Sequence, residues 1–510
     1  MKKWGEAMDY ILAYDFGTSG VKAALVDYEG RLIGDKECGY PLLYKGGGFV
    51  EQEPQAYWDA VCKATRTVIE NAGIPAESVT GMSFSTQGLG IIPLSKDGEI
   101  LYNNISWVDS RARAQADEIN EKLGRHEFDA ADVIPKYLWI KQNMPELYEK
   151  TAYFLDCTGY LNYMATGNIA MDYSGKAPYS ADEAEVKRRL SWYETAGLDV
   201  AKCPPLIPCT GYVGNLTEKA AAELGVTTAV EVYMGVVDVT CAAMGAGCCK
   251  EGDAHVYLGT SGWLTVVTGK DKFPSSQPGI WQLQAAEETK HLHAACTQCA
   301  GMALDWAIDR FYHTEKEMFA RGEKPSGEEN IYDLVNKEAA EVPAGSEGLL
   351  ATTWLLGEGC PITDEKAKAV YVGATQTHTR NYFVNAMMEA VCYSLRMEID
   401  DYRIDSGGKE VEKLGAIGGG AQSDHWMQMM ANVTGVPVSV PENCRHSGAI
   451  GSAAIVCVGK GIYKIDEIDR FVRIGKTFYP DPEKKAIYDR QYAIWQKLYP
   501  ALKDVFADLY

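Results

Sequence analysis

Residues 10–30 read YILAYDFGTSGVKAALVDYEG, a stretch in which the turn Gly-Thr-Ser-Gly lies between two short apolar runs. The same turn returns at residues 254–269, in AHVYLGTSGWLTVVTG, again after an apolar run. Short apolar runs bounded by glycine turns are typical of buried β-strands. Each stretch therefore predicts a strand, a tight turn and a returning strand. Their recurrence in the two halves of the chain predicts an internal duplication.

Both halves continue with alternating helices and strands. Apolar residues at helical spacing predict a helix over residues 55–71, and an apolar run predicts a strand over 79–85. In the second half, residues 380–403 form a long amphipathic pattern, and a helix is expected from about 423 to 435. This order predicts a mixed α/β sheet in each half.

A hairpin is expected inside the first half, with residues 91–94 pairing with 99–101. The boundary between the halves is expected near residues 248–254, where glycine and charged residues interrupt the apolar pattern. We therefore predict two similar domains, residues 1–252 and residues 253–510. A chain of 510 residues is long enough for two cores.

Composition narrows the class of protein. The net charge of −21 argues against nucleic acid as the main partner, because phosphate backbones attract clustered Lys and Arg. The sequence contains no run of about 20 apolar residues, so no membrane span is predicted. The first ten residues lack the apolar segment of a signal peptide. A cytoplasmic protein with reduced cysteines is expected.

One set of residues resembles a metal site by its types. His291, His293, Cys296 and Cys299 lie close in sequence, but no second Cys pair or spaced His pair completes a zinc pattern. A strand with buried thiols is the preferred interpretation, and no metal is expected there.

The two Gly-Thr-Ser-Gly turns are candidate phosphate-binding loops. Small residues after a strand let backbone N–H groups approach an anion, and the hydroxyls of Thr18, Ser19, Thr260 and Ser261 add donors. Two such turns from two domains would hold a polyphosphate from both sides. An ordinary β-turn is the alternative for either copy alone.

Three charged residues near these turns carry candidate chemistry. Asp15 at a strand end can hold a hydrated Mg²⁺, and Lys22 can neutralise phosphate oxygens; a turn-capping Asp and a surface Lys are the alternatives. Asp238 follows an apolar strand and precedes small residues, which suits a base for a hydroxyl group. A helix N-cap is the alternative for Asp238.

Other strand ends carry polar or aromatic residues suited to a sugar. Gln87, Trp107 and Asp109 would recognise hydroxyl groups through amide, indole and carboxylate contacts. Solvated turns are the alternative.

A set of ordered motifs now identifies a family. The chain resembles the FGGY carbohydrate kinases, and its xylulokinase-like members above all, from residue 10 to about residue 461. The motifs that carry the resemblance are DFGTSGVK, GFVEQEP, WVDSR, GVVDVTCAAMGAG, LGTSG, AGMALDW, GGGAQSDHWMQMMANVTGVPV and SGAIGSAA.

The resemblance implies a duplicated actin-like ATPase fold, with two RNase H-like α/β domains around a cleft, and ATP with Mg²⁺ as the cofactors. It implies that Asp238 is the catalytic base, and that Asp15 has a catalytic role beside Mg²⁺. The implied nucleotide-binding residues are Thr18, Ser19 and Lys22 in the first loop, Gly259, Thr260 and Ser261 in the second, Gly301 near the nucleotide, and Gly419, Gly420 and Asp424 beside the adenosine.

The sequence departs from the family pattern in the sugar pocket. Xylulokinases usually place a Met-His pair directly after the Gln equivalent to Gln87, and that His contacts sugar; here Gly88 and Leu89 stand there. Gly359 also replaces the Arg of a related GER motif. The identity of the sugar is therefore open.

We predict an ATP-dependent kinase that phosphorylates a primary hydroxyl of a ketose or polyol. The expected partners are that small molecule and ATP, with a homodimer as a candidate assembly. The main alternative is an actin-like ATPase of chaperone or filament type; a sugar-binding protein without catalysis is another.

Overall fold

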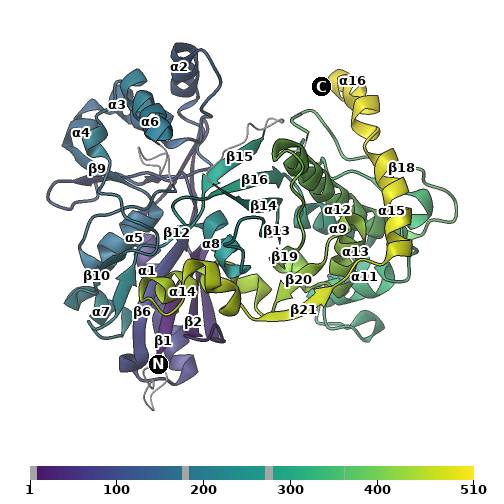
Figure 1. The fold of residues 1–510 in the computed structure, drawn as a ribbon, viewed down its shortest axis with the longest axis horizontal. Coiled ribbons are helices and arrows are strands. Elements are labelled where there is room, and N and C mark those ends of the chain that lie inside the picture. The colour runs from purple at the N-terminus through teal and green to yellow at the C-terminus, as the bar shows by residue number, and fades with distance from the viewer. Residues whose placement is uncertain (1–8, 175–182, 270–278, 361, 510) are drawn as a thin grey trace. The chain divides into compact units, whose positions relative to one another are not determined.

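The computed structural model describes residues 9–174, 183–269, 279–360 and 362–509 (Figure 1). The chain divides into two compact units. The first unit comprises Met1–Cys249, Gln284–Lys290 and His446–Val472, and the second unit comprises Lys250–Leu283, His291–Arg445 and Arg473–Tyr510.

A seven-stranded sheet is the centre of the first unit. Its strands are β1 (Tyr10–Phe16), β2 (Gly20–Asp27), β3 (Leu32–Gly39), β6 (Val79–Thr86), β10 (Tyr212–Asn215), β11 (Glu231–Tyr233) and β12 (Val236–Val237). The order is β10-β11-β6-β1-β2-β3, and β12 also pairs with β6. Strands β1, β2 and β3 are antiparallel neighbours, whereas β1, β11 and β12 each run parallel to β6.

The two faces of this sheet are covered by helices from distant parts of the chain. Successive side chains of a strand point to opposite faces, so Leu12 and Tyr14 pack in the core that includes residues of α1 (Pro54–Ala72). Ile11 and Ala13 pack on the other face with residues of α14 (Ser447–Gly459). Figure 1 shows α14 beside β1 and β6 despite its late place in the chain.

Helix α14 departs from the expected division after residue 252. Its sequence, SGAIGSAAIVCVG, is small and apolar almost throughout, so the helix is stable only when covered on most sides. Its neighbours β1, β6 and α8 (Asp238–Gly245) belong to the first unit, and His446–Val472 is therefore part of that unit.

Smaller elements complete the first unit. Two small sheets are present, one of β4 (Leu43–Gly46), β5 (Phe49–Gln52) and β8 (Asn104–Ile105), the other of β7 (Ile92–Ser95) and β9 (Thr151–Leu155). The remaining α-helices described are α2 (Arg113–Leu123), α3 (Val133–Asn143), α4 (Pro145–Lys150), α5 (Cys157–Thr166), α6 (Glu183–Thr195) and α7 (Glu218–Leu224).

The expected hairpin over 91–94 and 99–101 is present. Leu94 and Ile100 form an antiparallel bridge, the Ser95 N–H donates to the Glu99 carbonyl and the Leu101 N–H donates to the Pro93 carbonyl, both at 2.9 Å. The other edge of β7 pairs along its whole length with β9, a strand that is more distant in the sequence.

The second unit repeats the plan around its own seven-stranded sheet. The strands are β13 (Ala254–Leu258), β14 (Gly262–Thr268), β15 (Ile280–Gln284), β16 (His291–Thr297), β19 (Leu414–Ile417), β20 (Val438–Pro441) and β21 (Ile474–Phe478), in the order β15-β16-β14-β13-β19-β20-β21. Strand β13 is antiparallel to β14 and parallel to β19, as β1 is antiparallel to β2 and parallel to β6. The duplication predicted from the two turns is present.

Helices also surround the second sheet. They are α9 (Gly301–Phe311), α10 (His313–Ala320), α11 (Ile331–Ala339), α12 (Arg380–Asp405), α13 (Asp424–Thr434), α15 (Pro482–Trp495) and α16 (Leu498–Leu509), with a short pair of strands, β17 (Leu350–Ala351) and β18 (Tyr371–Val372). The long helix expected over 380–403 ends two residues later than predicted. Within the described residues, no helix combines the length and apolar character that crossing a bilayer requires.

Candidate functional site

Three polar residues meet at one edge of the first unit's sheet. In the register, Phe16 lies opposite Thr86, and Thr86 lies opposite Val237, so parallel strands β1, β6 and β12 end together. Asp15 precedes the first of these ends, whereas Gln87 and Asp238 follow the other two. With strands about 4.8 Å apart, the outer two ends are separated by roughly 10 Å. The register thus gathers three of the predicted residues.

The first Gly-Thr-Ser-Gly turn is fixed through its carbonyl groups. Gly17 N–H donates to the Gly20 carbonyl (3.0 Å), and the Tyr40 hydroxyl donates to both the Gly17 and Gly20 carbonyls. The Ser19 carbonyl accepts from the Tyr40 N–H, and the Thr18 carbonyl accepts from the side-chain amide of Gln52. All four carbonyl oxygens of the turn accept hydrogen bonds from the protein. An anion bound at the turn would therefore be repelled less than it would be by free carbonyl oxygens.

Asp15 lies among charges of both signs. It faces Lys22 across the β1–β2 ladder, and Gly448 at the start of α14 is so close that a Cβ there would lie 2.6 Å from the Asp15 Cγ. Burial raises the pKa of the Asp15 carboxyl, while Lys22 and then His446 lower it. The close approach of a helix start therefore requires glycine at 448.

Asp238 is the first residue of α8, and its Oδ1 accepts from the Val239 N–H (2.8 Å). The N-cap position belongs to Val237, so the alternative that Asp238 caps the helix is not what the structure has. Burial, followed by the charge of Asp15, raises the pKa of Asp238 to about 7. A carboxyl with this pKa exchanges protons near neutral pH.

The three residues expected to contact sugar differ in their surroundings. Gln87 is buried, and Trp107 is 44% exposed with its Nε1 donating to the Thr18 Oγ1 (2.9 Å). Asp109 is completely buried, and its carboxylate accepts from the Arg111 guanidinium (2.8–3.0 Å) and from the Val50 N–H (2.6 Å). Gln87 and Trp107 lie near the first Gly-Thr-Ser-Gly turn, whereas the Asp109 carboxylate is buried in an ion pair with Arg111. Sugar contact by any of the three residues stays a prediction.

Sequence reasoning missed Lys136 of α3. This lysine is completely buried, and its Nζ donates to the carbonyls of Leu89 and Ser106, both at 2.8 Å. Leu89 has φ +58°, a left-handed conformation that is strained for leucine. Burial lowers the pKa of Lys136 to about 7. A lone lysine in the apolar run VIPKYLWI was the available signal.

In the second unit, the second Gly-Thr-Ser-Gly turn follows β13 and meets the start of α9. Gly259 N–H donates to the Ser261 carbonyl (3.1 Å), and Gly301 N–H donates to the Gly259 carbonyl (2.7 Å). A Cβ on Gly301 would lie 2.5 Å from that same oxygen. Thr260 is exposed at the turn. The structure thus brings the predicted residue Gly301 directly against the second loop.

The glycine turn after β19 lies against the end of β13. A Cβ on Gly420 would lie 2.8 Å from the Leu258 Cβ, and Gly419 has open space where its Cβ would be. Asp424 begins α13 and forms an exposed ion pair with Lys476 (2.6 Å). The predicted glycines therefore neighbour the strand that leads into the second loop, whereas Asp424 already has a cationic partner.

The candidate metal residues do not converge on one point. His291 and His293 share one face of β16, and Cys296 lies on the other because strand side chains alternate. Within the described residues, no group of three or more His, Cys, Asp or Glu side chains could hold a metal ion. The interpretation of these residues as a metal-free strand stays a prediction.

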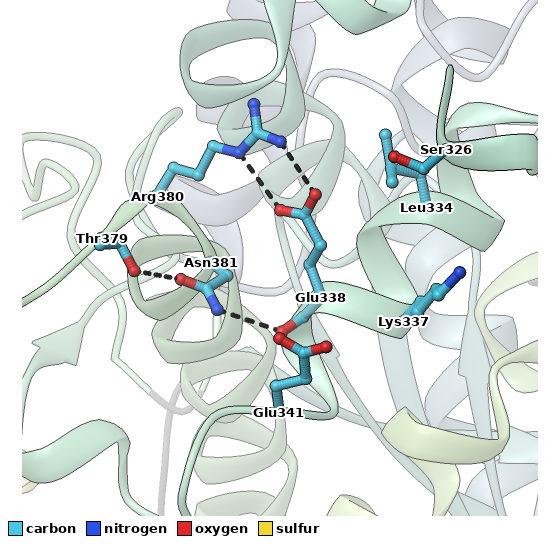
Figure 2. A pocket seen from close by; sticks show the side chains of 8 residues that line it. All are labelled: Ser326, Leu334, Lys337, Glu338, Glu341, Thr379, Arg380 and Asn381. Carbon is cyan, nitrogen blue, oxygen red and sulfur yellow. Dashed lines mark hydrogen bonds and ion pairs between the residues drawn. The ribbon is translucent and has the colours of Figure 1, made fainter. Parts of the chain in front are cut away.

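A pocket in the second unit has charged walls (Figure 2). Arg380 reaches Glu338 with two hydrogen bonds (2.9 and 3.2 Å), and Asn381 donates to the Glu338 carbonyl (3.2 Å). The lining residues are Ser326, Leu334, Lys337, Glu338, Glu341, Thr379, Arg380 and Asn381. No predicted site residue is among them, and we assign no ligand to this pocket.

Comparison with known proteins agrees with this geometry. Residues 10–245 match the N-terminal domain of the FGGY family of carbohydrate kinases, and residues 254–459 match its C-terminal domain. The chain is 29% identical to a xylulose kinase of Bacillus subtilis over 98% of both chains. It is 27% identical to a gluconokinase of the same organism, over 93% of this chain and 92% of that one.

A solved xylulose kinase from Lactobacillus acidophilus superposes with a TM-score of 0.82, at 22% identity, over 99% of this chain and 100% of that one. The predicted fold class, a duplicated α/β fold of the actin-like ATPase type, is confirmed. The two domain matches together cover most of the chain, in agreement with its two strand–turn–strand units and polar strand ends. This chain therefore belongs to the FGGY family of carbohydrate kinases.

Proposed function

We propose that this carbohydrate kinase transfers the γ-phosphoryl group of ATP to a primary hydroxyl of a ketose or polyol, with Asp238 as the general base. The observation that supports this best is the register that ends β1, β6 and β12 together and gathers Asp15, Gln87 and Asp238. Family membership sets aside the alternative of a chaperone or filament ATPase.

In the proposed reaction, the Asp238 carboxylate accepts the proton of the substrate hydroxyl as its oxygen bonds to the γ-phosphorus. The bond between the γ-phosphorus and the β–γ bridging oxygen breaks, and ADP leaves with that electron pair. A pKa of about 7 suits a base that must be ionised to act yet accept a proton in the transition state. A general base contributes about 10²–10⁴-fold to the rate.

The phosphate groups would be held mainly by backbone amides. We propose that both Gly-Thr-Ser-Gly loops bind phosphate oxygens of ATP, with Thr18, Ser19, Gly259, Thr260 and Ser261 as donors. Lys22 adds a positive charge beside the first loop. Gly301, Gly419, Gly420 and Asp424 stay our candidates for the neighbourhood of the nucleoside.

Asp15 fits a role in holding Mg²⁺. Its carboxylate lies one residue before the end of β1, at the sheet edge where Asp238 also lies, and burial disfavours its charged form, so a cation beside it would favour ionisation. Mg²⁺ keeps several waters and binds phosphate oxygens, so one or two protein carboxylates suffice. When bound, the ion would neutralise phosphate charge.

The residues that follow Gln87 favour a substrate other than xylulose. Leu89 offers no side-chain donor where xylulokinases usually place a sugar-contacting His. A Cβ on Gly88 would lie 3.0 Å from the Val237 Cγ2, so a larger residue there would press on the strand that leads to Asp238. We expect D-xylulose to be phosphorylated with a lower kcat/KM than some other ketose or polyol.

The test is ADP release over a panel of D-xylulose, L-xylulose, D-gluconate and polyols, with Asp238→Asn alongside. The wild type should release ADP with at least one ketose or polyol of the panel, whereas activity with D-gluconate alone would exclude the proposed substrate class. Asp238→Asn should lower kcat by about 10²–10⁴-fold while ATP affinity stays within threefold. Asp97→Asn, in an exposed turn, is the control and should behave as the wild type. Retention of a tenth of the activity by Asp238→Asn would exclude the general-base role.

A further inference from the structure

Gln52, the last residue of β5, joins the first phosphate loop to the substrate side. It is completely buried. Its Nε2 donates to the Thr18 carbonyl (2.7 Å), and its Oε1 accepts from the Gln87 Nε2 (2.9 Å) and the Tyr57 hydroxyl (2.6 Å). One side-chain amide thus touches both the loop expected to bind phosphate and the residue expected to bind sugar.

The polarity of this chain of hydrogen bonds is fixed from one end. The Thr18 carbonyl can only accept, so the NH₂ group of Gln52 must face it. The Gln52 oxygen therefore faces Gln87, and Gln87 must present its own NH₂ group in return. The Gln87 Oε1 is then directed away from Gln52, as a hydrogen-bond acceptor.

This acceptor has no partner within the part of the chain that the structure describes, although it is buried. A buried oxygen without a donor costs free energy, and folded proteins seldom retain one without a use. A ligand hydroxyl is the chemical group that supplies the missing donor. The arrangement favours a sugar or polyol contact at Gln87 Oε1.

Gln52 itself has little freedom to move. It lies opposite Asn104 in the β5–β8 pair, and Asn104 Nδ2 donates to the Tyr57 hydroxyl (2.8 Å) that in turn donates to Gln52. The preceding residue, Glu51, is held by the Arg111 guanidinium (2.8 Å). Strand pairing and an ion pair therefore hold the amide in a single orientation.

We propose that Gln52 is a positioning residue, which orients the Gln87 amide so that its oxygen accepts a substrate hydroxyl and which fixes the Thr18 carbonyl of the phosphate loop. In this role Gln52 acts through Gln87 and Thr18 and makes no contact of its own with substrate or nucleotide. The inference rests on the proposed function, since it takes Gln87 as a sugar ligand and Thr18 as part of the ATP site.

A double-mutant cycle tests whether Gln52 acts through Gln87. Gln52→Met keeps the side-chain length and removes both hydrogen-bonding ends. With the best panel substrate, it should lower kcat/KM for the sugar about 10–100-fold. In the Gln87→Met background, the same change should cost less than about threefold, because residues that act through one contact are not additive. Gln55→Met on the exposed face of α1 is the matched control and should leave both constants unchanged.

A second variant separates positioning from general loss of structure. In Gln52→Glu, a protonated carboxyl can still donate to the Thr18 carbonyl and accept from Gln87, whereas the ionised form cannot donate. The ratio of variant to wild-type kcat/KM should therefore fall at least fivefold from pH 6 to pH 8. A merely structural role predicts a ratio that does not change with pH.

Failure of this inference can be told apart from failure of the proposed function. If the wild type phosphorylates no panel member, the proposed substrate class is wrong, and titration with ATP in a calorimeter still tests Gln52. Gln52→Met should then weaken ATP binding about three- to tenfold. Additive losses in the cycle, a pH-independent ratio, or wild-type affinity for ATP in Gln52→Met would each overturn the positioning role.

Discussion

Asp238→Asn should inactivate the enzyme and, at the same time, stabilise the folded protein. Burial and the charge of Asp15 raise the pKa of the Asp238 carboxyl from 3.8 to about 7. Between those two values, the folded state holds a proton that the unfolded state has released. The free energy of unfolding therefore falls as pH rises through this window, and the whole loss is present above the folded pKa.

The size of this penalty follows from the two pKa values. It is on the order of 4 kcal/mol at pH 8 and on the order of 1–2 kcal/mol at pH 5. Asparagine has nearly the same shape, keeps an oxygen for the Val239 N–H and does not ionise. Asp238→Asn should therefore remove the penalty, and it should do so more at pH 8 than at pH 5.

Thermal unfolding without nucleotide and with a chelator present measures this difference. Because the entropy of unfolding grows with size, one kcal/mol corresponds to about 1–2 °C for units between the first unit and the whole chain of 510 residues, so Asp238→Asn should raise Tm by roughly 4–8 °C at pH 8 and by less than half of that at pH 5. Asp97→Asn, in an exposed turn, should change Tm by less than about 1 °C. An equal shift at both pH values, or a lower Tm for Asp238→Asn at pH 8, would refute the reasoning.

Three further substitutions have definite expected results. Leu89→His adds a side-chain donor and should raise kcat/KM for D-xylulose relative to the best panel member by roughly 10-fold or more; the pocket argument fails if the wild type already prefers D-xylulose. Lys136→Met leaves the Leu89 carbonyl without its lysine donor, so the sugar KM should rise by roughly tenfold while the ATP KM stays within threefold. The exposed Lys122→Met is its control, and equal effects on both KM values would count against a role at the sugar pocket. Gly301→Ala would place a Cβ 2.5 Å from the Gly259 carbonyl, so ATP affinity measured by calorimetry should fall at least tenfold, and wild-type affinity would show that the second loop does not bind ATP.

Much of the candidate site could be predicted because it depends on local order along the chain. Apolar runs predicted the strands, and polar residues at or next to the ends of those runs gave Asp15, Gln87 and Asp238 as candidates. Parallel strands end at a common edge, so residues far apart in sequence meet there without any further information.

Long-range contacts of loops could not be predicted in the same way. Lys136 acts on the carbonyl of Leu89, 47 residues earlier, and Gln52 acts on Thr18, 34 residues earlier. No periodicity carries that information, since loop conformation decides which carbonyl a side chain reaches. Asp109 illustrates a missed local signal, because Arg111 two residues later is the ion-pair partner that holds it inside.

The return of α14 to the first unit has a consequence for how the chain is made. The face of β1 that carries Ile11 and Ala13 is synthesised early, but α14, the helix packed against this strand, begins only at Ser447. At about 5–20 residues per second, the ribosome needs on the order of 20–90 s to add the roughly 430 residues between them. Through that interval the nascent first sheet lacks the helix that completes the cover of this apolar face, and incompletely covered apolar surface is the kind that chaperones bind. A fragment ending at residue 252 would lack α14 permanently and should aggregate, so we expect that cutting the chain between its two sequence halves does not yield two independent folding units.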